Sequence, residues 1–99
     1  MRKTRLALVG FGNVGRALAR LLLRKAKELH VEQGIEFMVS GIATGHSGVA
    51  VNPAGLPLER ALEVAEANRS LNELSAIDPP EGIPAFLQAA QAEVVFENT

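Results

Sequence analysis

The segment from Leu6 to Gly15 constrains the fold more than any other part of the chain. It reads LALVGFGNVG: a short apolar run is followed by three glycines at the spacing G-x-G-x-x-G, and a helical pattern begins directly afterwards. In a dinucleotide-binding turn the first glycine allows the tight turn, the second lets a diphosphate approach the backbone, and the third lets the helix pack closely. These roles fall to Gly10, Gly12 and Gly15, so the segment predicts a cofactor-binding turn.

The same spacing also occurs in glycine-rich turns of α/β domains that bind nothing, and this alternative stays open. The surroundings favour binding, because the motif follows an apolar run typical of a central parallel strand and opens a helix. Free N–H groups and a partial positive charge at the start of that helix would hold the phosphates.

The composition sets limits on the function. The chain has 99 residues, enough for one domain, and its net charge of −1 gives no electrostatic reason to expect nucleic acid or a membrane surface as a partner. It contains no cysteine, and no cluster of His, Asp and Glu has the spacing of metal ligands. The apolar run of Leu6 to Val9 is too short for a secretory signal, so we expect a cytoplasmic protein.

Hydrophobic periodicity predicts alternating strands and helices. We expect strands at 6–9, 36–44 and 93–97, helices at 14–29, 57–68 and 84–91, and a short helical turn at 70–77. The stretch 45–57 is rich in Gly, Pro, Asn and Ser, which predicts a long loop that is either functional or mobile. The fold class is therefore α/β: an incomplete Rossmann-type sheet of about three parallel strands in the order 2-1-3, with helices on both faces.

Two residues inside the motif have structural alternatives. Phe11 is expected either to cover the phosphate loop or to pack under it, and Asn13 is expected to cap the following helix. The basic residues of that helix fall mostly away from the apolar face, and the nearly neutral net charge favours a solvated surface over a basic binding stripe. These residues are Arg16, Arg20, Arg24 and Lys27.

The end of the second strand bears on the choice of cofactor. An NAD site usually carries an acid there, which bonds the ribose hydroxyls. This chain has the sequence ATGHS instead, and Thr44, His46 and Ser47 can donate to a ribose phosphate. That favours NADP over NAD, although no arginine is present to clamp the phosphate and NAD stays open. His46 is equally well interpreted as an ordinary exposed histidine.

Several segments together resemble the amino-terminal part of homoserine dehydrogenases. The resemblance extends over nearly the whole chain, is most specific at Gly10 to Arg16, and continues in Gly41 to Thr44, in Gly55 to Leu58 and in the terminal VVFENT. It implies an NAD(P)-dependent oxidoreductase that interconverts L-homoserine and aspartate 4-semialdehyde in threonine and methionine biosynthesis. It also implies that the cofactor lies along Phe11, Asn13, Val14 and Gly15, with Thr44 near the adenosine ribose and with Asn98 and Thr99 toward the nicotinamide.

The resemblance also implies what residues 1–99 lack. Family members carry the catalytic lysine, the substrate-binding acids and the dimerisation region beyond the positions matched here. We therefore expect 1–99 to be an NAD(P)-binding fragment with no catalytic residue and no activity alone, whereas the longer parent takes the amino-acid substrate and forms a homodimer. The alternatives are another Rossmann dehydrogenase, a non-catalytic NAD(P)-sensing module, and a fragment that binds nothing.

Overall fold

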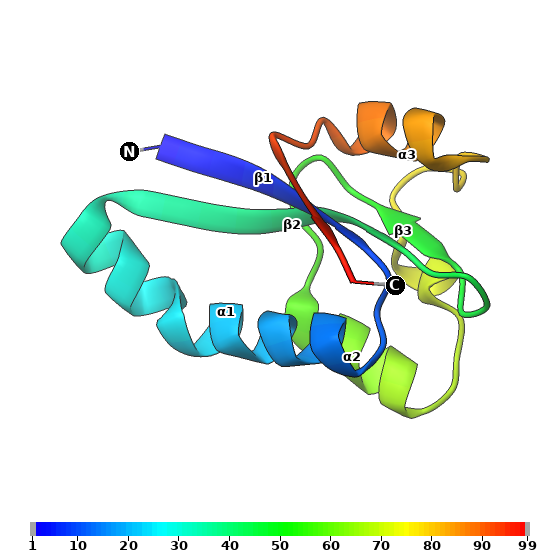
Figure 1. Ribbon diagram of the computed structural model, residues 1–99, viewed down its shortest axis with the longest axis horizontal. Coiled ribbons are helices and arrows are strands. Elements are labelled where there is room, and N and C mark those ends of the chain that lie inside the picture. The colour runs from blue at the N-terminus through cyan, green and yellow to red at the C-terminus, as the bar shows by residue number, and fades with distance from the viewer. Residues whose placement is uncertain (1, 99) are drawn as a thin grey trace.

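The strand that precedes the glycine turn lies in the middle of the sheet. In the computed structural model, which describes residues 2–98, β1 (Arg2–Val9) pairs in parallel with β2 (Ile35–Ala43) on one side and with β4 (Val94–Glu97) on the other (Figure 1). A short strand, β3 (Val49–Val51), runs antiparallel to β2, which gives the order β3-β2-β1-β4. The expected arrangement of the parallel strands, 2-1-3, is confirmed.

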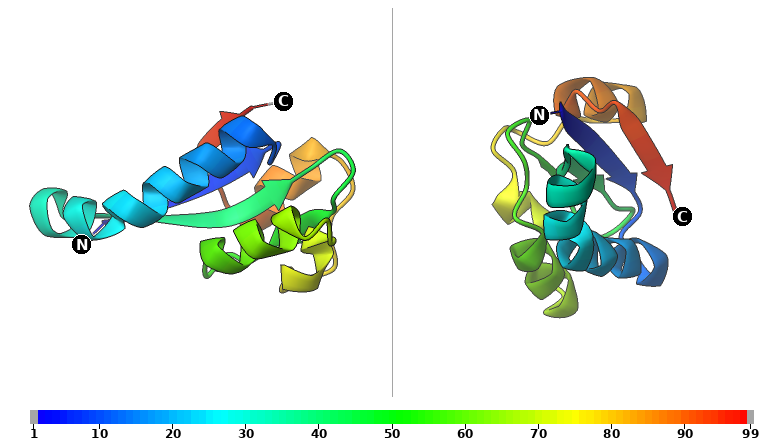
Figure 2. Two further views of the ribbon diagram at one scale, coloured as in Figure 1. Left: turned by 90° about the horizontal axis from the view of Figure 1, so that it is seen from below. Right: turned by 90° about the vertical axis from the view of Figure 1, so that its left-hand side faces the viewer.

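Helices cover both faces of this sheet, as expected. The helix α1 (Asn13–Gln33) and the helix α2 (Leu58–Glu66) lie on one face, and α3 (Ile83–Ala90) lies on the other (Figures 1 and 2). A single 3-10 turn, η1 (Leu71–Leu74), packs against β3 and α2. The chain is therefore an open α/β sheet of the Rossmann type.

The segment 45–57 differs from the expected loop because it contains β3. The backbone of this segment also bonds to β2 beyond the strand, since Asn52 N donates to Ser40 O at 2.9 Å and Leu56 N donates to Val39 O at 2.7 Å. Ser40 is the extra residue of a bulge, because Leu6 pairs with Val39 whereas Ala7 pairs with Gly41. These bonds hold the segment along the outer edge of β2.

The two faces of the sheet bury two separate apolar clusters. Leu6 and Leu8 point toward α1 and α2 and join the larger cluster, whereas Ala7 points the other way and joins a smaller cluster with Phe86 of α3. This alternation along β1 is what a strand covered on both faces requires. Among the described residues, no helix is long and apolar enough to cross a membrane.

Gly41 allows α3 to lie close to the sheet. A Cβ atom placed on Gly41 would lie 2.8 Å from Phe86 Cζ and 2.9 Å from Ala90 Cβ. We expect Gly41→Ala to lower the free energy of unfolding by about 1–3 kcal/mol, the usual cost of overpacking a core. Urea unfolding followed by circular dichroism measures this, with Gly45→Ala as the control, because a Cβ on Gly45 meets nothing within 4 Å. Equal losses in the two variants would contradict the packing argument.

Candidate cofactor-binding site

The first glycine of the motif makes the turn that leaves β1. Gly10 has a φ of 104°, in the left-handed region that favours glycine. Its N–H donates to Ala43 O at 2.7 Å, so the turn starts beside the end of β2. The glycine is therefore required by the backbone conformation, as the motif predicts.

The start of α1 presents unpaired backbone N–H groups. The first bond of the helix runs from Arg16 N to Gly12 O at 2.9 Å, and within residues 2–98 the N–H groups of Asn13, Val14 and Gly15 donate to no acceptor. Asn13 and Val14 are exposed. We call residues 12–15 the amide cradle, because three donors and the positive end of a long helix meet there.

Asn13 does not cap the helix, which is a correction to the sequence-based expectation. The helix begins at Asn13 itself, so Gly12 occupies the capping position. The side chain of Asn13 lies instead beside Arg16, with Oδ1 3.5 Å from Nη2. Within residues 2–98, no side chain therefore takes the cradle's donors, and they stay available to a ligand.

Gly12 faces open space. A Cβ atom placed there would meet no other atom of the described residues within 4 Å, and Gly12 does not have a positive φ. Neither packing nor backbone strain within the chain thus requires a glycine at this position. Close approach of a ligand is the explanation that the dinucleotide-binding motif offers.

Phe11 packs under the turn rather than over it. Its side chain is 7% exposed and belongs to the core cluster that includes Leu6 and Leu8. Of the two alternatives for this residue, the buried one is correct. Any contact of Phe11 with a cofactor would therefore come from its backbone, while the ring supports the turn from below.

The end of β4 reaches the same corner. Asn98 N donates to Val9 O at 2.9 Å, and Asn98 Nδ2 donates to Val9 O at 3.2 Å and to Gly10 O at 3.0 Å. A Cβ atom on Gly15 would lie 2.9 Å from Gly10 O and 2.7 Å from Asn98 Oδ1. The third glycine of the motif is thus needed for close packing, and one of its neighbours lies far away in the sequence.

The loop after β2 uses Thr44 to close itself. The hydroxyl of Thr44 donates to Gly48 O at 2.7 Å and accepts from Ser47 N at 2.8 Å. Because a hydroxyl has one proton, Thr44 has none left for a ribose phosphate in this conformation. His46 and Ser47 are exposed on the loop.

Arg16 is a residue of the site that the sequence analysis assigned to a solvated surface. Its Nε lies 3.3 Å from Gly12 O, so the guanidinium folds back onto the first turn of α1. The signal was its spacing, since Arg16 is four residues from Gly12 and therefore lies above it on the helix. It brings a positive charge to the rim of the amide cradle.

The structure brings together most of the residues proposed for the cofactor. The turn at Gly10, the amide cradle and Asn98 are in contact, and the loop of Thr44 begins one residue after Ala43, which bonds Gly10. Thr99 lies outside the residues that the structure describes. Within 2–98, no group of three His, Cys, Asp or Glu residues is placed to hold a metal ion.

No family model matches the chain, but individual proteins do. It is 33% identical to the homoserine dehydrogenase of Methanocaldococcus jannaschii, over 93% of this chain and 27% of that protein. It is 26% identical to the NAD(+)-dependent homoserine dehydrogenase of Pseudomonas canavaninivorans, over 100% of this chain and 28% of that protein.

Solved structures give the same result. A hyperthermophilic archaeal homoserine dehydrogenase in complex with NADPH superposes with a TM-score of 0.76 at 26% identity, over 98% of this chain and 28% of that chain. A mutant of a hyperthermophilic archaeal homoserine dehydrogenase, also with NADPH, gives a TM-score of 0.74 at 27% identity. The chain spans between 27% and 28% of the length of these relatives. In sequence and in fold, it is similar along nearly its whole length to one segment of homoserine dehydrogenases, which confirms the resemblance found from the residues.

Proposed function

We propose that this chain is the NAD(P)-binding part of an oxidoreductase that interconverts L-homoserine and aspartate 4-semialdehyde. The observation that carries the proposal is the amide cradle: unpaired N–H groups at the start of a 21-residue helix, beside the open surface of Gly12. The cradle lies at the carboxyl end of the central strand, where open α/β sheets bind their ligands.

The residues present fit a dinucleotide. The diphosphate would accept hydrogen bonds from the cradle, and the positive end of α1 with the nearby guanidinium of Arg16 would offset its charge. The open surface at Gly12 lets the phosphates approach without a clash. When bound, the nicotinamide supplies hydride transfer, while the protein contributes binding and orientation.

We further propose that the site takes NADP in preference to NAD. Among the relatives, both solved structures described above hold NADPH, and one protein is named as NAD(+)-dependent. In this chain the residues from Ala43 to Gly48 include no acid that would repel a ribose phosphate, and His46 and Ser47 are exposed there. Arg16 is the only arginine among residues 10–16. It lies beside Gly12, where the diphosphate would bind, and therefore does not bear on the ribose phosphate.

On this proposal, residues 1–99 supply cofactor binding, and the other parts of the activity come from residues outside this range. We propose that the catalytic group, the amino-acid substrate site and a dimer interface come from the rest of a longer cytoplasmic protein. On this proposal the 99-residue chain binds the cofactor without turning over homoserine. A non-catalytic module that senses NAD(P) would use the same cradle.

The proposal is tested by titrating the purified chain with NADPH and with NADH while the nicotinamide fluorescence is recorded. We expect saturable binding of both, with NADPH about tenfold tighter, which corresponds to roughly 1.4 kcal/mol. ADP-ribose should compete with both, because it carries the same diphosphate. A chain that is folded by circular dichroism yet binds neither cofactor would contradict the proposal, and a preference for NADH would contradict the choice of NADP.

A further inference from the structure

We propose that Asn98 is a positioning residue that sets the shape of the amide cradle, acting on the cofactor through the glycine turn. The resemblance places this residue near the nicotinamide, but its side-chain amide is directed at the turn. The inference rests on the proposed function for its ligand, whereas the fixing of the turn is a property of the chain that can be measured without any cofactor.

The amide of Asn98 binds two consecutive carbonyls of the turn. Its Nδ2 lies 3.2 Å from Val9 O and 3.0 Å from Gly10 O, and the backbone N of Asn98 also donates to Val9 O at 2.9 Å. Since an amide nitrogen carries two protons and a carbonyl oxygen carries none, these contacts fix which way the amide points. The end of β4 is therefore tied to the turn by both its main chain and its side chain.

The oxygen of the same amide is directed at the helix. Asn98 Oδ1 is buried, accepts no hydrogen bond from the described residues, and lies 2.7 Å from where a Cβ of Gly15 would be. A partial negative charge at the first turn of α1 is favourable because the helix start is positive. One side chain thus fills the space between the end of β4, the turn and the third glycine of the motif.

Because Asn98 holds the carbonyls of Val9 and Gly10, it also affects the direction of the N–H groups in the amide cradle. Gly10 O and Gly12 lie two residues apart, so a change in the peptide plane at Gly10 moves the N–H groups that follow. A turn held by Asn98 presents these groups already ordered, whereas a loose turn must lose conformational freedom when the diphosphate binds. Affinity should therefore depend on Asn98 even though the diphosphate does not touch it.

Three substitutions separate the roles of the amide. Asn98→Leu keeps the shape and removes both the donors and the acceptor, and Asn98→Asp removes the donors and adds a charge facing two carbonyl oxygens. Asn98→Ser replaces the amide by a shorter hydroxyl, whose single proton cannot serve both carbonyls. The matched control is Ser75→Ala at the other edge of the sheet. Its hydroxyl donates to Ile77 O at 2.8 Å and accepts from Val51 N at 3.0 Å, so the control also loses side-chain hydrogen bonds to the backbone.

Two readouts are needed: the dissociation constant for NADPH, and hydrogen exchange of the Gly10 and Arg16 amides in the free chain. Both amides are hydrogen bonded, to Ala43 O and Gly12 O. We expect the leucine and serine variants to bind NADPH about tenfold more weakly and the aspartate variant weaker still, because each of them loses amide hydrogen bonds to the turn. Exchange at Gly10 should accelerate by a similar factor, while Ser75→Ala changes neither quantity more than twofold.

The outcomes are distinguishable. Unchanged affinity and unchanged exchange at Gly10 in the Asn98 variants would overturn the proposal, and weaker binding without faster exchange would do so too, because it would show direct contact with the cofactor. If the wild-type chain does not bind NADPH, the proposed function fails, and exchange at Gly10 alone decides whether Asn98 fixes the turn. If the leucine variant does not fold, the serine variant decides in its place.

Discussion

Replacing Gly12 by valine is expected to weaken NADPH binding by about 100-fold or more while leaving the fold intact. A Cβ at this position meets nothing within 4 Å, and the backbone there does not have a positive φ, so neither the backbone conformation nor the Cβ opposes a valine. Its methyl groups then fill the open surface beside the amide cradle. Losing two charge-assisted hydrogen bonds to the diphosphate accounts for a loss of about 3 kcal/mol, or more than 100-fold.

Fluorescence titration gives the affinity of the Gly12→Val variant, and thermal unfolding gives its stability. Gly12→Ala provides a graded comparison, because a single methyl group should obstruct the diphosphate less than an isopropyl group. We expect the order wild type, alanine, valine in affinity, with unfolding midpoints within a few degrees of each other. Wild-type affinity in the valine variant would place the diphosphate elsewhere.

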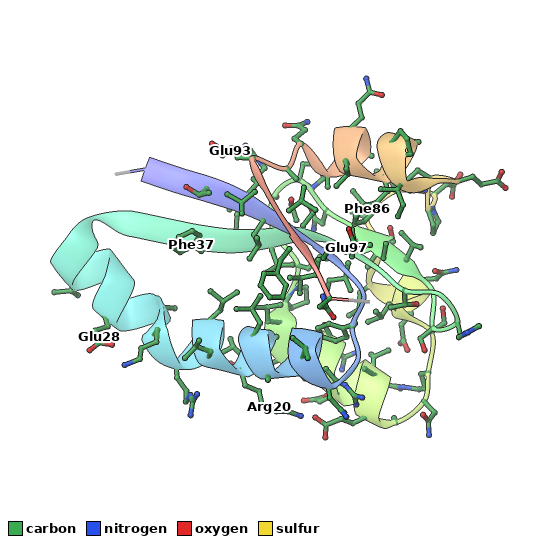
Figure 3. The ribbon with its side chains drawn as sticks, in the orientation of Figure 1. Arg20, Glu28, Phe37, Phe86, Glu93 and Glu97 are labelled. Atoms are coloured by element: carbon green, nitrogen blue, oxygen red, sulfur yellow. The ribbon has the colours of Figure 1, made fainter. Side chains whose placement is uncertain are left out.

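Replacing Phe86 by alanine is expected to lower the free energy of unfolding by about 3–5 kcal/mol, the usual cost of removing a buried aromatic ring. Phe86 is 1% exposed, and its ring points from α3 toward the sheet (Figure 3), where it packs with Ala7, Val51 and Ala90. The neighbours of the ring on β1 and β2 include Ala7, Ala43 and Gly41, which are too small to fill the space that the ring would leave. The loss is a large part of the stability of a domain of this size.

Urea unfolding measures this loss, and Ile83→Ala in the same helix is the matched control. Ile83 is 43% exposed, so its truncation should cost less than about 1 kcal/mol. A comparable loss in both variants would mean that the stability of α3 itself, rather than the packing of the ring on the sheet, limits the fold.

The parts of the fold that follow from the sequence are those encoded by neighbouring residues. The first strand, the turn and the first helix can be predicted because each has a local signal. The apolar run indicates the strand, the glycine spacing indicates the turn, and the helical period indicates the helix. The parallel order followed from the strand-helix-strand pattern. The first strand extends back to Arg2, further than predicted, because its polar half pairs with β2 where β4 does not reach.

The strand β3 could not be predicted in the same way. It has three residues, and Gly and Pro surround it, so local propensity indicates a loop. Its edge is held by side chains from far along the chain: Asn72 Oδ1 accepts from Val49 N at 2.7 Å, and Ser75 Oγ accepts from Val51 N at 3.0 Å. Pairing of this kind depends on tertiary contacts, which a single sequence does not reveal.

The same distinction applies to the site. The glycines of the motif have stereochemical roles that can be read from their spacing. Gly10 has the positive φ and Gly15 the close packing that these roles require, and Gly12 faces open space. The internal hydrogen bonds of Thr44 and the contact between Asn98 and Gly10, 88 positions apart, could be seen only in three dimensions. Residue types at strand ends predict where the site lies, but not what each side chain does there.

The two edges of the sheet differ in how well they are covered. One is closed by β3 and the segment after it, whereas within residues 2–98 no strand adjoins the side of β4 that faces away from β1. There Val94, Val95 and Phe96 are 45%, 46% and 37% exposed, so apolar side chains are accessible on both faces of β4. An exposed apolar edge strand can pair with a strand of another molecule, and such pairing leads to aggregation. At high concentration, copies of the chain should therefore associate by pairing their β4 edges, unless another polypeptide covers that edge first.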